Sequence, residues 1–182
     1  MNELMVHYPL LAEFINEQSL SSFVEVGVWR GHLSYYILNH CPCVQRSYAI
    51  DPYTHWNPKV YKDSANVKQD KFDKIYIEAT RRLAEFGSRN FLLRMASVEA
   101  AAHLKKEQFD FVFIDANHDY EWVTKDLKAW YSMVRPGKIF GGHDYGHRRF
   151  PGVKKAIDKF CDRKGMEIKT MTGYVWYATK PV

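Results

Sequence analysis

The chain has 182 residues, of which 46% are hydrophobic and 26% charged, enough to bury the core of one globular domain. It contains no unbroken apolar run of the roughly 18–20 residues that a membrane span needs, no secretory signal pattern and only three cysteines, so we expect a cytoplasmic protein without membrane contact. The net charge is +5, but the basic residues are scattered, and this argues against a nucleic-acid partner.

Strands and helices are predicted to alternate along the chain, after a leading helix within residues 1–20. Strands are predicted at residues 22–27, 47–51, 90–94, 109–115 and 138–142, and helices at residues 31–39, 67–86, 97–104, 120–133 and 153–164. Two more strands joined through Gly173 predict a β-hairpin within residues 165–180. This order is typical of an α/β fold with a doubly wound, mostly parallel sheet, here of seven strands with an antiparallel C-terminal hairpin. We expect one domain over residues 1–182, with residues 21–160 as its core.

The turn after the first predicted strand reads Glu25-Val26-Gly27-Val28-Trp29-Arg30-Gly31. Glycines at a strand-to-helix turn let a ligand approach the backbone and the helix N-terminus. The second strand ends in Asp51, which can accept hydrogen bonds from both hydroxyls of a ribose. A dinucleotide-binding turn has a glycine where this chain has Trp29, and Glu25 would repel phosphates. We therefore expect a nucleoside cofactor that carries an amino group and no phosphates.

The fourth predicted strand is the apolar run from Phe111 to Ile114, and it ends in Asp115, with His118 three residues later. The fifth strand ends in His143 and Asp144. The ends of adjacent parallel strands lie within a few ångströms of each other, at the edge of the sheet where ligands bind. Helix capping could account for either aspartate alone, but not for two acids and two histidines together. We interpret this group as a reaction centre.

Together these motifs resemble the class I S-adenosylmethionine-dependent methyltransferases, over about residues 23–160. The residues that carry the resemblance are Glu25-x-Gly27-x-x-x-Gly31, Asp51, Met95-Ala96-Ser97 and Asp115-Ala116-Asn117-His118. Within the class, the chain is similar to the metal-dependent O-methyltransferases that act on catechols, cephalosporins and macrolide sugars. The resemblance implies a Rossmann-like fold and S-adenosylmethionine as cofactor. Its implied cofactor site has the methionine part at Glu25, Gly27, Trp29 and Gly31, the ribose at Asp51, the adenine at Ala96 and Ser97, and Asp115 beside the cofactor.

The same resemblance implies a divalent cation, Mg²⁺ or Mn²⁺, at Asp115, His143 and Asp144. His143 departs from the acid or amide that relatives carry, and its softer imidazole favours Mn²⁺ or another transition metal. Alternatively, His143 would be the base of a metal-free enzyme. His118 is expected to be the general base, so that the catalytic residues would be His118, Asp115 and His143.

The acceptor site is expected beside the long segment at residues 52–66. Tyr53 and Trp56 would belong to an aromatic lid, or would simply pack this loop against the protein. Arg148 follows the fifth strand and would bind an acidic group of the acceptor, or lie in a solvated loop. Three tryptophans are expected to be core residues, namely Trp122, Trp130 and Trp176.

We therefore expect an enzyme that methylates a hydroxyl group of a small molecule or sugar, assisted by a divalent metal. The alternatives are a metal-free methyltransferase, a nucleic-acid methyltransferase, a non-catalytic S-adenosylmethionine-binding protein and an NAD-dependent oxidoreductase. The scattered charge and the lack of an Asn/Asp-Pro-Pro-aromatic motif argue against a nucleic-acid substrate. A homodimer remains open, because without a cap domain a partner chain could supply part of the acceptor pocket.

Overall fold

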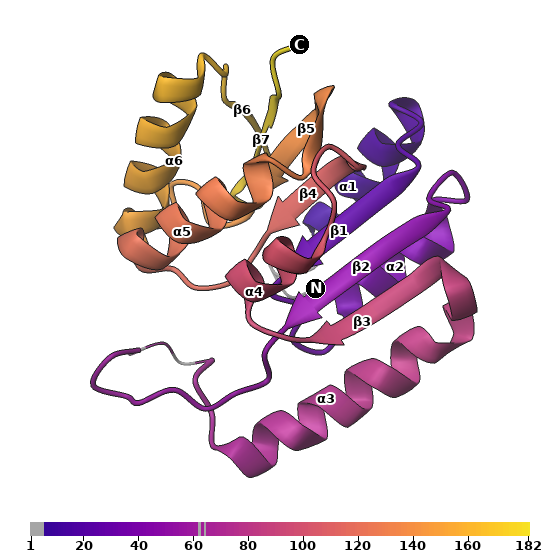
Figure 1. Ribbon diagram of the computed structural model, residues 1–182, viewed down its shortest axis with the longest axis vertical. Helices are drawn as coiled ribbons and strands as arrows, with labels where there is room; N and C mark the ends of the chain where they lie inside the picture. The colour runs from indigo at the N-terminus through magenta and orange to yellow at the C-terminus, as the bar shows by residue number, and fades with distance from the viewer. Residues whose placement is uncertain (1–5, 62, 64) are drawn as a thin grey trace.

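A computed structural model describes residues 6–61, 63 and 65–182, and a seven-stranded sheet with helices on both faces forms its centre (Figure 1). The strand order is β3-β2-β1-β4-β5-β7-β6. Neighbouring strands among β1 to β5 are parallel, whereas β7 pairs antiparallel with β5 and β6. The strands are β1 (Ser22–Val26), β2 (Arg46–Asp51), β3 (Asn90–Arg94), β4 (Phe109–Ile114), β5 (Val134–Gly142), β6 (Lys169–Met171) and β7 (Val175–Thr179). The predicted mostly parallel, Rossmann-like sheet with an antiparallel C-terminal hairpin is confirmed.

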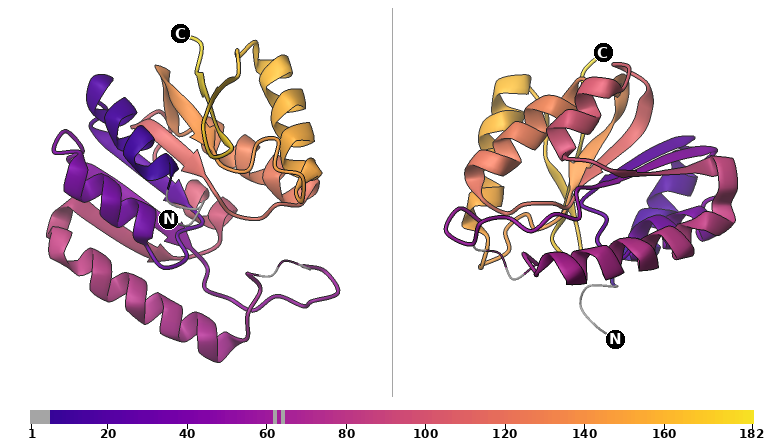
Figure 2. Two further views of the ribbon diagram at one scale, coloured as in Figure 1. Left: turned by 180° about the vertical axis from the view of Figure 1, so that it is seen from behind. Right: turned by 60° about the horizontal axis from the view of Figure 1, so that its bottom comes forward.

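Six α-helices of the described residues cover the sheet, three on each face (Figure 2). One face carries α1 (His7–Glu17), α2 (His32–His40) and α3 (Gln69–Leu83), and the other carries α4 (Ser97–His103), α5 (Tyr120–Tyr131) and α6 (Pro151–Lys164). None of these helices combines the length and the hydrophobicity needed to cross a membrane.

The central strand β4 shows why the run from Phe111 to Ile114 is apolar without interruption. All six of its residues are buried. Phe111 and Phe113 pack into the core beneath α1 and α2, and Val112 and Ile114 pack into the core beneath α5 and α6. Successive side chains of a strand point to opposite faces, so the part of a strand that helices cover on both sides is apolar at consecutive positions. Asp110, the one charged residue of β4, accepts hydrogen bonds from Ser21 and from Arg135 instead.

Two elements differ from the sequence prediction in their bounds. The helix predicted over residues 67–86 ends at Leu83, and a 3₁₀ segment, η2 (Ala84–Arg89), follows it. Strand β5 begins at Val134 rather than at residue 138, because Val134 is buried and pairs with Phe109. The predicted Pro136-Gly137 turn therefore lies inside β5, and the β4–β5 register shifts beside it.

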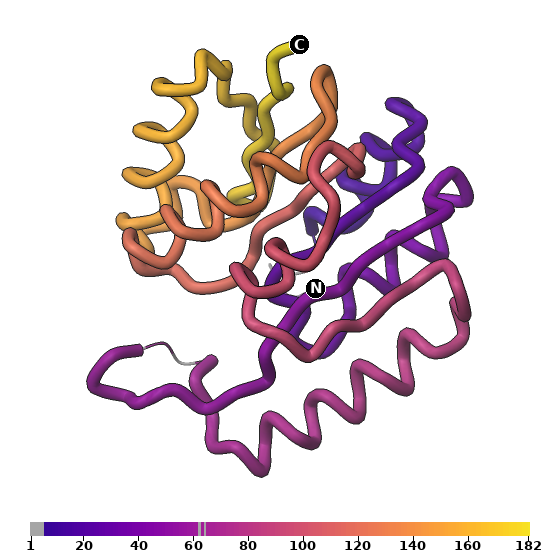
Figure 3. Tube along the Cα trace, in the orientation of Figure 1, coloured from indigo at the N-terminus to yellow at the C-terminus, as the bar shows by residue number. Residues whose placement is uncertain are grey.

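The carboxyl ends of the parallel strands meet at one edge of the sheet. Pairing of Ile114 with Gly142 brings the residues that follow β4 and β5 together at this edge. The backbone N–H of His143 donates to the carbonyl of Ile114 at 3.0 Å, which continues the ladder beyond the strands. The long segment between β2 and α3 also leaves the sheet here and extends away from it (Figure 3).

Candidate active site

A cavity of about 1100 Å³ opens at this edge of the sheet. Its walls come from the turns that follow all five parallel strands, from the start of α1 and from the β6–β7 hairpin. The predicted site residues that line it are Glu25, Gly27, Trp29, Asp51, Trp56, Ala96, Ser97, Asp115, His118, His143 and Asp144. Gly31, Tyr53 and Arg148 were also predicted to contact ligands, but they do not line the cavity.

Gly27 lets the turn after β1 pack directly against the end of β4. Its φ is +93°, and a Cβ at this position would lie 1.9 Å from the backbone oxygen of Asp115. Any side chain here would force the two strand ends apart. Trp29, two residues later, also has a positive φ of 51°, and its N–H donates to Oδ2 of Asp51 at 2.9 Å. The turn after β1 is thus anchored to both neighbouring strands.

Gly31 has a structural position rather than a ligand-facing one. It precedes α2 with a φ of +73°, a conformation that glycine adopts without a Cβ penalty. A Cβ there would meet the side chain of Leu83 at 3.2 Å, so this residue faces α3. The structure thus gives Gly31 a role in the turn and does not place it in the cavity wall where a cofactor contact was expected.

Glu25 is a buried carboxyl group in the cavity wall, with 3% of its surface exposed. Its Oε2 accepts hydrogen bonds from the N–H of Ser34, at 3.0 Å, and from the Ser34 hydroxyl. Burial raises the pKa of Glu25 to about 8, although the Ser34 contacts act in the opposite direction. A cationic group in the cavity would favour the ionised form of this carboxyl.

Asp51 joins the turn after β1 to the start of the β2–α3 segment. Its Oδ2 accepts from the N–H of Trp29, and its Oδ1 accepts from the N–H of Tyr53 at 2.8 Å. Burial raises the pKa of Asp51, and the backbone hydrogen bonds oppose this shift. A carboxylate offers about four acceptor positions, so each oxygen can still accept one hydrogen bond from the cavity side.

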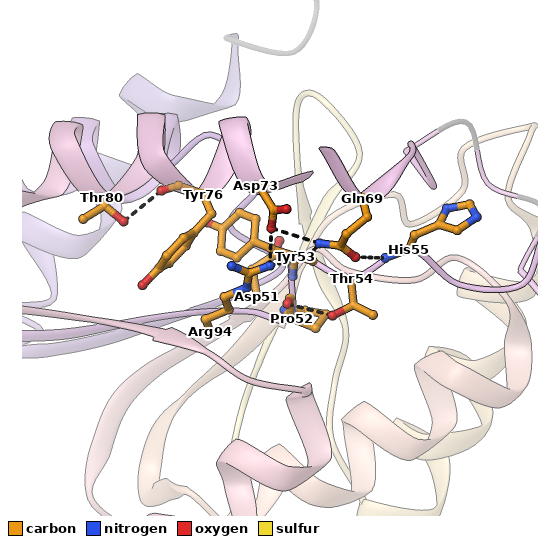
Figure 4. Close-up of polar contacts among 10 residues, drawn as sticks. All are labelled: Asp51, Pro52, Tyr53, Thr54, His55, Gln69, Asp73, Tyr76, Thr80 and Arg94. Atoms are coloured by element: carbon orange, nitrogen blue, oxygen red, sulfur yellow. Dashed lines mark hydrogen bonds and ion pairs between the residues drawn. The ribbon is translucent and has the colours of Figure 1, made fainter. Parts of the chain in front are cut away.

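Tyr53 packs into the protein instead of covering the cavity. Its side chain is fully buried against Phe72, Ile75 and Ala79, and its ring lies 5.1 Å from that of Tyr76 on α3 (Figure 4). Its carbonyl accepts hydrogen bonds from Gln69 and Arg94, the latter also paired with Asp73, as Figure 4 shows. The lid role predicted for Tyr53 is therefore wrong, because the apolar face of α3 buries the ring.

Other aromatic residues form the outer wall of the cavity. Trp56 and Tyr61 of the β2–α3 segment line it, and the Trp56 ring lies 5.6 Å from that of Trp122. Trp122 was expected in the core but is half-buried and faces the cavity, whereas Trp130 and Trp176 are buried as predicted. Periodicity put all three tryptophans on buried faces, and it cannot distinguish a cavity wall from a core.

The predicted acids and histidines converge at the ends of β4 and β5. Among the predicted residues, the closest contact joins Nε2 of His118 to Oδ2 of Asp144 at 2.9 Å. Nδ1 of His143 lies 3.3 Å from the same oxygen of Asp144 and 3.8 Å from Oδ1 of Asp115. A further acid, Asp63, lies with its Oδ2 2.5 Å from Nδ1 of His118. The sequence prediction missed Asp63, because no motif distinguishes it within the long β2–α3 segment.

These contacts shift the pKa values of the side chains that meet here. We call them the acid–histidine group: Asp63, Asp115, His118, His143 and Asp144. Burial lowers the pKa of His118, but hydrogen bonds to Asp144 and Asp63 outweigh it and raise this pKa to about 10. His143 shows the same balance, and Asp144 and Asp115 raise its pKa. Burial favours the neutral form of Asp144, yet hydrogen bonds from both histidines hold its pKa far below the usual range. Burial raises the pKa of Asp115, which has the weaker histidine contact.

Three of these residues could hold a metal ion. Asp115, His118 and Asp144 each offer a ligand atom, and the three atoms lie within 4.8 Å of one another. This group contains His118, whereas the ligand set expected from the sequence contained His143. Arg148, the other predicted residue beyond β5, is exposed, and the neighbouring Arg149 lines the cavity in its stead. The order of two adjacent loop residues does not reveal which one turns inward.

Comparisons with known proteins agree with this geometry. A family model described as a methyltransferase domain matches residues 24–145, whereas no curated protein matches the sequence. Among solved structures, the O-methyltransferase NovP has a TM-score of 0.70 at 17% identity, over 99% of this chain and 80% of that chain. Cofactor-bound Rv0187 from MTB has a TM-score of 0.69 at 14% identity, over 96% and 79%.

A third similar structure is the O-methyltransferase from Bacillus cereus in complex with SAH, with a TM-score of 0.62 at 15% identity, over 96% of this chain and 80% of that chain. Identities this low establish a common fold. The family model adds membership, because it covers more than half of the chain, including the end of β1, all of β2 and the acid–histidine group. This chain belongs to the methyltransferase-domain family and has the fold of S-adenosylmethionine-dependent O-methyltransferases.

Proposed function

We propose that this protein transfers the methyl group of S-adenosylmethionine to a hydroxyl oxygen of a small-molecule or sugar acceptor, assisted by a divalent cation. The observation that carries the proposal is the convergence of Asp115, His118 and Asp144 in the cavity that Glu25 and Asp51 also line. One part of the cavity suits a nucleoside cofactor and another suits an acceptor hydroxyl. Two of the similar structures are O-methyltransferases, which supports this reaction.

The residues present fit the cofactor. Asp51 keeps two acceptor positions for the ribose hydroxyls. Glu25 is buried, and the described residues place no cationic side chain in hydrogen-bond contact with it, which suits the ammonium group of the methionine part. Ala96 and Ser97, at the start of α4, would flank the adenine. Two of the similar structures have a cofactor or SAH bound.

The residues also fit a divalent cation. Two carboxylates and one imidazole form a mixed oxygen and nitrogen set, which favours Mn²⁺ or another transition ion over Mg²⁺. When bound, such a cation lowers the pKa of an acceptor hydroxyl that it contacts. To become a metal ligand through Nε2, His118 would lose the proton on this nitrogen and its hydrogen bond to Asp144. Its hydrogen bond from Nδ1 to Asp63 would remain and would orient the ring.

The protein's own residues would position the acceptor. Trp56 and Trp122 provide two aromatic faces beside the site, and Phe150 stacks on the imidazole of His118 with ring centroids 3.8 Å apart. These rings exclude water from the reacting oxygen, and methyl transfer then depends mainly on alignment. Both α1 and the C-terminal hairpin line the same cavity, so we treat residues 1–182 as one catalytic unit.

A metal-free reaction is the second candidate, and the contacts of His118 favour it. Both ring nitrogens of His118 are engaged by carboxylates, so in this arrangement it has no lone pair that could take a proton. His143 would then be the base, oriented by Asp144, and the imidazolium of His118 would stabilise the developing oxyanion.

One experiment separates these readings. The protein is incubated with S-adenosylmethionine and panels of catechols, sugars and aliphatic alcohols, with Mn²⁺, with Mg²⁺ or with a chelator, and products are identified by mass spectrometry. Turnover that the chelator abolishes supports the metal-assisted reaction, and turnover that survives chelation supports the metal-free one. Tight binding of S-adenosylhomocysteine without any methylated product would instead indicate a non-catalytic binding protein.

A further inference from the structure

Asp126 of α5 is a buried carboxyl group that the proposed reaction does not use. Only 4% of its surface is exposed, and it lines the cavity. Burying a carboxylate is costly unless hydrogen bonds or a partner compensate for the lost hydration. Its position in the cavity wall therefore calls for an explanation.

A chain of hydrogen bonds fixes the orientation of this carboxylate. The indole N–H of Trp130 donates to Oγ of Ser97 at 2.8 Å, and the Ser97 hydroxyl donates to Oδ1 of Asp126 at 2.5 Å. Indole can only donate, so the single proton of Ser97 is committed to Asp126. Within the described part of the chain, the second oxygen of Asp126, Oδ2, has no hydrogen-bond partner.

The position of Asp126 relative to the other acids of the cavity indicates what Oδ2 would meet. The carboxylates that line the cavity are Glu25, Asp51, Asp63, Asp115, Asp126 and Asp144. Three belong to the acid–histidine group, and Glu25 and Asp51 suit the methionine part and the ribose. Asp126 is bonded to Ser97, where α4 begins after β3, which is the part of the wall assigned to the base.

We propose that Asp126 selects the base of the cofactor, with Oδ2 accepting a hydrogen bond from the exocyclic amino group of adenine. This inference rests on the proposed function, since it assumes S-adenosylmethionine in the cavity. A base with an oxo group at the same position would place an acceptor against the carboxylate and leave both unpaired. Sites that bind a polar group in this way reject analogues that lack the matching donor.

The Ser97 bond also predicts how an amide would behave at this position. In Asp126→Asn, the committed proton of Ser97 holds the amide oxygen, so the amide nitrogen takes the place of Oδ2. The variant would present a donor to the cavity where the wild-type protein presents an acceptor. Its preference between an amino and an oxo base should therefore reverse.

Isothermal titration calorimetry with S-adenosylhomocysteine and S-inosylhomocysteine tests this inference without turnover. We expect the wild-type protein to bind the adenine compound at least about 10-fold more tightly, the usual effect of one hydrogen bond to a charged group. In Asp126→Asn, this ratio should fall to one or below. Asp162→Asn, an exposed change on α6 with the same loss of charge, should keep the wild-type ratio.

Each outcome of these titrations supports or contradicts the proposed role of Asp126. Equal affinity of the wild-type protein for the two compounds overturns the role of Asp126, and so does a wild-type ratio in Asp126→Asn. If Asp126→Asn does not fold, the ratio of the two affinities is measured in Asp126→Ala. There it should approach one, because no side chain at this position forms a hydrogen bond with the base. If the wild-type protein binds neither compound, the proposed cofactor is wrong, and the role of Asp126 is then wrong as well. This result differs from binding both compounds with equal affinity, which contradicts the role of Asp126 alone.

Discussion

Nδ1 of His118 lies 2.5 Å from Oδ2 of Asp63, although 55 positions separate these residues in the chain. The contact joins the long β2–α3 segment to the turn after β4. It therefore couples the aromatic wall, which includes Trp56 and Tyr61, to the acid–histidine group. The segment that covers the acceptor side and the residues proposed to react are held by the same hydrogen bond.

Replacing Asp63 with asparagine should slow methyl transfer more than it weakens cofactor binding. Loss of a carboxylate that orients a metal-binding or catalytic histidine typically costs about 10–100-fold in activity. Steady-state kinetics and calorimetry with S-adenosylhomocysteine measure the two effects. Asp70→Asn, at an exposed position on α3, is the matched control and should leave both unchanged. Equal losses in activity and cofactor affinity would contradict a role on the acceptor side.

Asp115→Ala and Asp144→Ala should each abolish turnover while leaving S-adenosylhomocysteine affinity largely intact. Either change removes one of the two carboxylates from the candidate metal group. Mn²⁺ titrations followed by electron paramagnetic resonance should show weaker binding in both variants if the metal-assisted reaction is correct. Unchanged Mn²⁺ affinity together with lost turnover would favour the metal-free reaction.

Asp51→Ala should lower the affinity for S-adenosylhomocysteine by at least about 100-fold, because two hydrogen bonds to a charged group would be lost. Part of the loss would come from the turn itself, since Asp51 also accepts from the backbone of Trp29 and Tyr53. Methylthioadenosine, tested in parallel by calorimetry, separates the ribose contact from the methionine part, because it has the ribose hydroxyls and no amino-acid part. Wild-type affinity in this variant would show that the ribose assignment is wrong.

Gly27→Ala should destabilise the protein by more than about 3 kcal/mol, because the added Cβ collides with the backbone at the end of β4. Gly165→Ala is a matched control at the end of α6, with a similarly positive φ of +64° but no atom within 4 Å of the added Cβ. There the cost should be only about 1–2 kcal/mol, from the backbone conformation alone. Urea denaturation gives both values, and similar losses at the two positions would refute the packing argument.

Glu25 should make the stability of the ligand-free protein depend on pH. Its pKa in the folded state is raised to about 8, so between the unfolded value and pH 8 the folded protein binds more protons than the unfolded chain. This contribution is fully present in acid and is lost as the pH rises through 8. In Glu25→Gln it should disappear. Denaturation curves at pH 5, 6, 7 and 8 measure the difference, and a constant difference between the two proteins would contradict the raised pKa.

The local pattern of the sequence was sufficient for the architecture and for the main outline of the site. The unbroken apolar run of β4 requires burial on both faces, and alternating strands and helices require parallel pairing. Parallel pairing in turn brings Asp115 close to His143 and Asp144, because strand ends in one sheet share an edge. For the same reason, Glu25 and Asp51 could be assigned to one cavity before the fold was known.

Contacts between distant segments decided the rest. Asp63 meets His118, Trp122 faces the cavity, Tyr53 turns into the core and His118 rather than His143 completes the candidate metal group. Among the described residues, the unpaired oxygen of Asp126 likewise depends on a contact between two helices: Ser97 of α4 donates to Asp126 of α5 and accepts from Trp130 of α5. The sequence by itself determined which residues follow the ends of the parallel strands, because the local apolar pattern sets where each strand ends. Only the tertiary structure decided where their side chains point, because that depends on packing between segments that no periodic pattern relates.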